Sequence, residues 1–234
     1  YGLKGMLQTD YDKLICVDIL CRSVASPLLL KKYLDMQNKE LGKIQNISFK
    51  DKYRGYDYPV MKINYIDKYN RKMTYSRGSE SDAWLRLFLS NEGDRPSCKT
   101  CIADKFGHCS DITIGDFNNT SQIPKSMNDN LGCSLVIVNT DKGKSIFSNI
   151  SDLIEYKGIN PVNKNHVRPA AVSENKFDKK QFYEDAKTLD GKDFYSKYYP
   201  ITKKVRLLRI LREMLYYTGI YSVIKILKRK KLKL

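Results

Sequence analysis

The sequence predicts an α/β protein of mixed α+β character, with a mixed-sheet core, flanking helices, a cysteine-bearing loop and a basic C-terminal helical tail. Segments with strand patterning and segments with helix patterning are interspersed along the chain. The composition, 41% hydrophobic and 29% charged, is that of a globular protein. The 234 residues suffice for one sizeable domain. We expect that domain over residues 1–185, followed by a linker and amphipathic tail over residues 186–234.

The first expected strand is the short, largely apolar run of residues 14–20, which is typical of a buried strand. A helix follows, because Ser26 is a favoured N-cap and Pro27 is favoured at the first helical position. Gly42 is a favoured residue for ending that helix. The expected apolar stripe of this helix consists of Leu30, Leu34 and Leu41.

Three further strand-like segments come next in the sequence. They cover residues 44–49, 59–66 and 72–75, and they are separated by a charged turn at 50–56 and a polar turn at 67–71. A second helix is expected over residues 81–91. Its apolar side consists of Trp84, Leu85, Phe88 and Leu89.

The second half of the chain continues the alternation of strands and helices. Strands are expected at residues 111–117 and 132–139, and Thr140 is placed to cap a helix over residues 142–154. Residues 158–176 look irregular. Two more helices are expected, over residues 179–187 and 203–217.

The positive charge of the chain is concentrated in its tail. Residues 203–234 hold eleven basic residues and one acidic residue, a balance of +10 out of the total +16. Such a tail favours an acidic partner. The tail also has apolar residues at helical spacing, so it has three possible roles: it packs on the protein's own domain, binds an anionic membrane surface or binds nucleic acid. The pattern favours nucleic acid least. The stripe consists of Leu207, Leu208, Leu211, Met214 and Leu215, and a cationic run follows at 228–233.

Composition also bounds the compartment. No uncharged apolar run approaches the roughly 18–20 residues that span a bilayer. Six cysteines are too few and too unevenly spaced for a disulfide-stapled secreted scaffold. We therefore expect a cytoplasmic protein with thiols free or bound to metal, with the inner face of the membrane as a second location. The chain starts at Tyr1, and we expect a fragment or a processed product.

The strongest chemical signal is the pair Cys98 and Cys101. Two thiolates separated by two residues can chelate one metal ion or cluster. A zinc site or a cubane iron–sulfur cluster needs four ligands, and His108, Cys109 and Cys21 are the candidates to complete the set. The alternative interpretation is a solvent-facing turn with incidental cysteines.

Charged residues elsewhere give weaker signals. Asp111 and Asp116 flank a strand and a glycine turn, where they either orient a site or bind a cation, or simply cap the turn. Lys50, Lys52 and Arg54 either bind an anionic cofactor or substrate or form a solvated charged turn. We expect Cys16 and Cys133 in the core and His166 at the surface.

Five segments in order resemble motifs of the coenzyme F420 hydrogenase/dehydrogenase beta-subunit family. The residues 17–27 are similar to its D-x-x-C-H-G-V-x-S-P motif, and 95–101 to its R-P-S-C-x-x-C motif. The other three segments are residues 47–56, 110–117 and 134–143. Together the five span about 130 residues.

The resemblance implies an iron–sulfur flavoprotein oxidoreductase subunit. Members of the family pass electrons between a [4Fe-4S] cluster, FAD and a small-molecule acceptor such as the deazaflavin F420. The resemblance implies Cys21, Cys98 and Cys101 as cluster ligands, and Cys109 is a candidate fourth ligand. A ferredoxin-like donor or a partner redox subunit would supply the electrons. We expect Lys50, Lys52, Asp111 and Asp116 to contribute to cofactor binding.

The sequence also departs from the family pattern. The family's C-H-G is Cys21-Arg22-Ser23 here, and the tryptophan after its G-D-F is Asn118. An upstream P-C-Q segment of the family lies outside this chain, and we expect a fourth ligand and part of the flavin site there. The alternative function is a degenerate, non-catalytic binding or scaffold protein, zinc-bound or metal-free, associated with polysaccharide biosynthesis.

Overall fold

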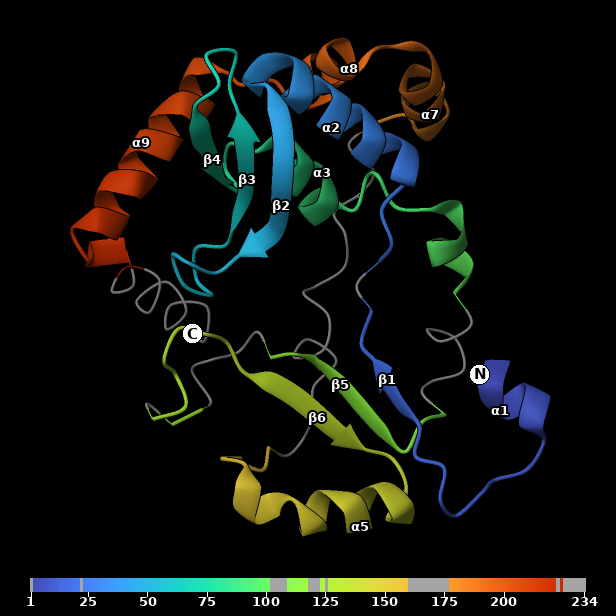
Figure 1. Ribbon diagram of the computed structural model, residues 1–234. Helices are drawn as coiled ribbons and strands as arrows, with labels where there is room; N and C mark the ends of the chain where they lie inside the picture. Colours follow the sequence, from blue (N-terminus) through green and yellow to red (C-terminus); the bar gives the residue numbers. More distant parts are fainter. Residues whose placement is uncertain are drawn as a thin grey trace. The chain divides into compact units, whose positions relative to one another are not determined.

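The computed structural model describes residues 2–21, 23–101, 109–117, 123–124, 126–159, 177–221 and 224. It is a mixed α/β structure, which confirms the predicted fold class. The chain forms two compact units, each with its own sheet (Figure 1). Unit 1 comprises Tyr1–Val24 and Pro96–Ala171, and unit 2 comprises Ala25–Arg95 and Val172–Leu234. Both units are therefore built from segments distant in sequence, and the units do not divide at residue 185.

Unit 1 contains a three-stranded sheet with the order β1-β5-β6. Strand β1 (Val17–Ile19) runs parallel to β5 (Ile112–Asp116), which runs antiparallel to β6 (Ser134–Val138). The helix α5 (Asp141–Asn149) follows β6 directly. The short elements α1 (Gly2–Leu7), η1 (Pro96–Thr100) and η3 (Ser151–Leu153) complete the described part of the unit.

Three expectations for unit 1 are wrong in detail. The first strand is a short edge strand rather than a buried one, since Val17 is 54% and Ile19 72% exposed. Val17 and Ile19 point to the same face of the sheet, which is exposed, whereas Asp18 on the other face is half-buried. Cys16 and Cys133 are half-buried and not in the core. The helix after Thr140 ends at Asn149, and a separate 3-10 turn follows.

Unit 2 contains an antiparallel sheet of β2 (Lys43–Asp51), β3 (Val60–Ile66) and β4 (Lys72–Gly78), with β3 in the centre. In Figure 1, α2 (Pro27–Leu41) and α3 (Ala83–Ser90) lie beside this sheet, and α7 (Lys179–Thr188) and α8 (Gly191–Tyr198) lie near α2. Helix α8 was not expected from the sequence. The central position of β3 explains why Val60, Met61 and Ile63 are buried.

The core of unit 2 joins residues that are far apart in sequence. Tyr33 of α2 lies 6.2 Å from Trp84 of α3 and 5.8 Å from Tyr195 of α8, measured between ring centroids. The stripe of α2 is shifted by one residue from the expected one, because Leu29 and Tyr33 are fully buried. Three residues of the expected stripe, Leu30, Leu34 and Leu41, are only partly buried.

The helix ends follow ordinary capping chemistry. Thr140 Oγ1 accepts a hydrogen bond from the Gly143 amide at 3.0 Å, which confirms the predicted cap. Asp82 caps α3 by accepting from the Leu85 amide at 2.8 Å. Helix α2 ends at Gly42, as expected. Gly42 has φ of +123°, and an added Cβ would lie 2.3 Å from the carbonyl oxygen of Ile66.

The tail helix α9 (Lys203–Tyr217) matches its expected bounds and belongs to unit 2. Its residues with reduced exposure include Arg209, Arg212 and Glu213, whereas Leu207 is 57% and Met214 58% exposed. The packed side of the helix is therefore mixed, since Val205, Leu215 and Tyr216 are also partly buried, whereas most of the predicted apolar stripe is exposed. No helix in the described ranges is long and apolar enough to cross a membrane.

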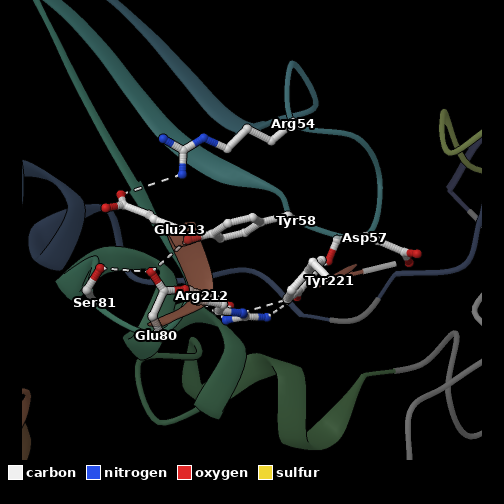
Figure 2. A network of polar contacts seen from close by, with 9 residues as sticks. Arg54, Asp57, Tyr58, Glu80, Ser81, Arg212, Glu213 and Tyr221 are labelled. Carbon is white, nitrogen blue, oxygen red and sulfur yellow. Dashed lines mark hydrogen bonds and ion pairs between the residues drawn. The ribbon is translucent and has the colours of Figure 1, made fainter. Parts of the chain in front are cut away.

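Ion pairs attach α9 to the rest of unit 2 (Figure 2). Arg212 Nη1 lies 2.8 Å from Glu80 Oε2, and Arg212 Nη2 donates to the Tyr221 hydroxyl at 2.6 Å. Arg54 Nη1 lies 3.5 Å from Glu213 Oε1. Helix α9 therefore packs on its own unit through these ion pairs and not through most of its apolar stripe, while the run at 228–233 lies outside the described residues.

Candidate functional site

The loop after β1 and the η1 turn meet at Cys98. Strand β1 is extended by one hydrogen bond, from the Leu20 amide to the Ile114 carbonyl at 2.8 Å, and the exposed Cys21 follows. The Val24 amide donates to Cys98 Sγ at 3.3 Å. This contact places Cys98 against the segment that carries Cys21, although 74 residues separate Val24 from Cys98.

The other two candidate ligands also belong to unit 1. Cys101 follows η1 directly, Cys109 precedes Ser110 and β5, and both are half-buried. His108 lies outside the described residues, as do Arg22, Asn118 and His166. Within the described ranges, no group of three histidine, cysteine or acidic side chains is close enough to hold a metal ion. The six cysteines, all in those ranges, form no disulfide.

Asp111 is fully buried and holds three parts of unit 1 together. Its Oδ2 accepts a hydrogen bond from the Cys16 amide at 2.8 Å, and its Oδ1 accepts one from the Thr140 hydroxyl at 2.8 Å. Its backbone adds two more, because its amide donates to the Cys16 carbonyl and its carbonyl accepts from the Asn139 amide. The side chain of Asp111 therefore fastens the start of β1 and the end of β6 to β5.

The electrostatics of Asp111 favour its charged form. Burial alone would raise the pKa of this carboxyl. The hydrogen bonds from the Cys16 amide and Thr140, together with the positive charges of Lys142 and Lys4, outweigh burial and lower the pKa below its ordinary value. Asp111 is thus an ionised anchor with both oxygens used inside the fold.

Asp116 occupies a different environment from Asp111. It ends β5, where it pairs with Ser134 of β6, and its side chain is exposed. Of the two carboxylates, Asp116 is the one that a ligand can reach. Asp111 acts on the site by fixing the strands around it.

The three basic candidates belong to unit 2. Lys50 has a left-handed backbone with φ of +53°, and Lys52 Nζ lies 5.2 Å from the centroid of the Tyr56 ring. Both sequence interpretations of Arg54, as a residue that binds an anion and as part of a solvated turn, are wrong, because its side chain is buried. It is only 7% exposed, and its guanidinium lies 5.2 Å from the centroid of the Tyr58 ring.

Sequence reasoning missed a buried polar cluster beside Asp111. Ser110 Oγ and Thr113 Oγ1 lie 3.1 Å apart, and Asn139 Nδ2 donates to Thr113 Oγ1 at 2.9 Å. Ser110 and Thr113 are buried. Their sequence signal was present, since polar residues within strand segments need partners when buried. The cluster binds the polar ends of β5 and β6 to each other.

A hollow of about 740 Å³ lies at the end of β6 and the start of α5. Thr140, Asp141, Lys144 and Phe147 are among its lining residues. One acid and one base balance each other there. The hollow therefore offers room near Asp111 but no preference for an anion.

The comparisons with known proteins give one match, to a family model. No curated protein and no solved structure matches the chain. A family model does match, over residues 1–164, and it describes the C terminus of the beta subunit of coenzyme F420 hydrogenase/dehydrogenase. The match covers β1 to β6 and α5 and ends before α7, so α7, α8 and α9 lie beyond it. The chain thus belongs to this family, that of the carboxyl-terminal part of the coenzyme F420 hydrogenase/dehydrogenase beta subunit.

Proposed function

We propose that this chain is an iron–sulfur flavoprotein oxidoreductase subunit that passes electrons between a [4Fe-4S] cluster, FAD and a small-molecule acceptor. Family membership supports an oxidoreductase domain of the F420 hydrogenase/dehydrogenase beta-subunit type. The observation that carries the finer proposal is the contact between the Val24 amide and Cys98 Sγ, which joins the two cysteine-bearing segments of unit 1.

The donor set fits an iron–sulfur cluster chemically. Cys21, Cys98, Cys101 and Cys109 offer four thiolates, the ligands that such clusters prefer. An amide that donates to a ligating sulfur stabilises its negative charge, and this raises the potential of a cluster. When bound, the cluster would supply one-electron transfer and the flavin two-electron transfer.

The chain's own residues have distinct parts in this proposal. Asp111 fixes β1, β5 and β6, and thereby the segments on which Cys21 and Cys109 are carried. In unit 1, the exposed Asp116 is proposed to contact the flavin or the acceptor. In unit 2, Lys50 and Lys52 are separately proposed to bind an anionic cofactor or substrate. The electron donor is proposed to be a ferredoxin-like protein or a partner redox subunit, in the cytoplasm.

The test is anaerobic purification, metal and sulfide analysis and a visible spectrum, for the wild type, Cys98→Ser and Cys133→Ser. We expect about four irons and four sulfides per chain in the wild type, and absorbance near 400 nm. Cys98→Ser should lose them. Cys133→Ser is the matched control, because Cys133 Sγ contacts the Met127 carbonyl in another part of unit 1.

Other outcomes select the alternative function. One zinc per chain, lost in Cys98→Ser, would favour the non-catalytic binding or scaffold protein. Iron retained in Cys98→Ser would contradict the assignment of this cysteine as a ligand. A flavin absorbance band, together with iron, would support FAD within this chain.

A second proposal concerns α9, whose apolar stripe is exposed. Leu207, Leu208, Leu211 and Met214 are 45–58% exposed. Lys203 and Lys204 lie at the start of the same helix. An apolar helix face with nearby cations is suited to the surface of an anionic membrane. We propose that this face binds such a surface and that the polar side stays on unit 2.

Vesicle flotation tests this proposal. The chain should float with phosphatidylcholine vesicles that contain phosphatidylserine and not with phosphatidylcholine alone. The variant Leu207→Gln/Leu211→Gln should lose flotation. The control is Leu153→Gln, which removes an apolar side chain that is 82% exposed in unit 1. Equal flotation of the double variant and the wild type would contradict the role of α9.

A further inference from the structure

Unit 2 contains a cavity of about 270 Å³ that no feature of the family motifs predicts. Residues of α2, β4, α3, α8 and α9 line it. All of these belong to one compact unit. The volume is near the lower end of the range for small-molecule sites.

Two residues that line this cavity each have a buried polar atom without a hydrogen-bond partner among the described residues. Gln37 is only 4% exposed, and its Oε1 accepts no hydrogen bond from them. The Nε of Arg209 is also buried, with no acceptor in the same part of the chain. An unmatched buried polar group costs about 1–3 kcal/mol. A ligand that donates to Gln37 and accepts from Arg209 would remove both costs.

The charge of the cavity lining is positive. Arg77, Lys192 and Arg209 contribute three cations, and Glu40 contributes one carboxylate. In the part of the chain that the structure describes, no ion pair neutralises any of the three cations. Arg77 instead donates through Nη1 to the carbonyl of Ser76 at 2.9 Å. The lining therefore favours an anionic ligand.

Tyrosine rings form much of the remaining wall, and their hydroxyls are used elsewhere. Tyr75 donates to Asp82, Tyr195 donates to the Leu29 carbonyl, and the hydroxyls of Tyr199 and Ser90 lie 2.9 Å apart. These rings thus offer apolar surface rather than further hydrogen-bonding groups. Gln37 and the cations are therefore the groups of the lining proposed to recognise the ligand, beside Glu40, Ser81 and Ser196.

We infer that this cavity is a binding site for a small anion: a phosphate monoester or a carboxylate of a polyol, which also carries a hydroxyl donor. The anionic group binds to Arg209 with Arg77 and Lys192 nearby. The donor binds to Gln37 Oε1, and the carbon skeleton lies against the tyrosine rings. A volume of about 270 Å³ suits a small molecule better than a complete flavin or dinucleotide.

The site is separate from the proposed redox chemistry. Lys192, Tyr195, Ser196 and Arg209 lie beyond residue 164, where the family match ends. The cysteines of the redox proposal belong to unit 1, whereas this cavity belongs to unit 2. The inference therefore stands or falls independently of a cluster.

Isothermal titration calorimetry on the full chain tests the site with four probes: glucose 6-phosphate, gluconate, glucose and inorganic phosphate. We expect glucose 6-phosphate or gluconate to bind, with glucose and inorganic phosphate at least about tenfold weaker, because each lacks one of the two interactions. The phosphate and carboxylate probes distinguish the two sources of the anionic group.

The variants Arg209→Gln and Gln37→Met should each weaken the better probe by at least about tenfold. Arg206→Gln is the matched control, because Arg206 is an exposed arginine one turn earlier on the same helix. Its affinity should equal that of the wild type. Circular dichroism shows whether each variant is folded. No binding of any probe by the folded wild type, or equal binding by folded Arg209→Gln, would overturn the inference.

Discussion

Asp111 Oδ1 accepts the hydroxyl proton of Thr140 at 2.8 Å, while Thr140 Oγ1 itself accepts the amide of Gly143 at 3.0 Å. A single hydroxyl thus links a buried carboxylate to the first turn of α5. The same carboxylate accepts the Cys16 amide through its other oxygen. The packing of α5 and the position of β1 consequently depend on one ionised side chain, and this dependence can be tested.

Replacing Asp111 by Asn should destabilise unit 1 by about 1–3 kcal/mol, because an amide cannot accept both hydrogen bonds equally and a charged acceptor is lost. Hydrogen exchange at the Cys16 amide should become faster. Asp116→Asn, which alters an exposed carboxylate of the same sheet, should change the free energy of unfolding by less than about 0.5 kcal/mol. Equal effects of the two variants would contradict the anchoring role.

The difference in the free energy of unfolding between the wild type and Asp111→Asn should depend on pH. The pKa of Asp111 is lowered in the folded protein, so its ionised form contributes stability above the unfolded pKa of about 3.8. That contribution is lost as the pH falls through the lower folded pKa. Chemical unfolding from pH 6 down to pH 3 should therefore bring the wild type closer to Asp111→Asn. A constant difference over this range would contradict the prediction.

Asp82 should give stability the opposite pH dependence. It is fully buried and accepts hydrogen bonds from Tyr33 at 2.7 Å and from Tyr75 at 2.9 Å. Burial raises its pKa from 3.8 to about 6, although these hydrogen bonds act in the other direction. The folded state then binds more protons than the unfolded state between these values. Stability contributed by the protonated form is lost as the pH rises from about 4 to 6.

The variant Asp82→Asn should remove this pH dependence while keeping the N-cap of α3, because Asn is also a favoured cap. The wild-type loss between pH 4 and pH 7 is on the order of 2–3 kcal/mol. Urea unfolding followed by the fluorescence of Trp84 measures it, since Trp84 lies in the same core. Asp35→Asn, at an exposed position on α2, should leave the wild-type slope intact.

The ion pair of Arg212 with Glu80 should hold α9 on unit 2. The Glu80 side chain is only 8% exposed, so removing its partner leaves a nearly buried charge. Arg212→Gln should therefore destabilise the protein by about 3 kcal/mol and expose α9 to trypsin. Arg206→Gln on the exposed side of the same helix is the control.

The double variant Arg212→Gln/Glu80→Gln separates charge burial from packing. It should be more stable than Arg212→Gln, because no unpaired charge remains. A double variant as unstable as the two single changes added together would show that the pair contributes by packing only. Urea unfolding of Arg212→Gln, Glu80→Gln and the double variant, compared with the wild type, gives the coupling energy.

A pair of helical glycines should respond with opposite signs to the same substitution. An added Cβ at Gly143 of α5 would lie 2.3 Å from the Asp111 carbonyl oxygen, whereas nothing lies within 4 Å of one at Gly5 of α1. Gly143→Ala should destabilise unit 1, because backbone must move. Gly5→Ala should stabilise α1 by up to about 1 kcal/mol. Thermal unfolding of both variants measures the two signs, and stabilisation by Gly143→Ala would contradict the close approach.

Local patterns predicted most of the elements correctly. Pro27, Gly42 and Thr140 predicted helix ends correctly, because these signals involve only nearby backbone. Ser26 stands at the N-cap position of α2, but its side chain makes no capping hydrogen bond. The alternation in residues 59–66 and the polar turn at 67–71 predicted β3 and β4. The family could also be predicted from sequence, because its motifs are contiguous segments, and the family match confirms it.

The features that depend on long-range contacts, such as burial and packing, could be seen only in the tertiary structure. The apolar content of residues 14–20 predicted a buried strand. Burial depends on neighbouring elements, however, and among the described strands β1 pairs only with β5. Arg54 looked like a solvated charge until its tyrosine partners from α9 were in place. The stripe of α9 looked like a packing face, yet its ion pairs attach the opposite side.

The sequence by itself therefore determined most of the elements, several helix ends and the family, since these depend on residues a few positions apart. Only the tertiary structure decided that Asp111 is an anchor, that Val24 contacts Cys98 and that Gln37 and Arg209 share a cavity. The physical reason is sequence separation. The contacts of Asp111 with Cys16, of Val24 with Cys98, and the shared cavity of Gln37 and Arg209 join residues more than 70 positions apart, and such contacts exist only once the chain has closed the loop between them.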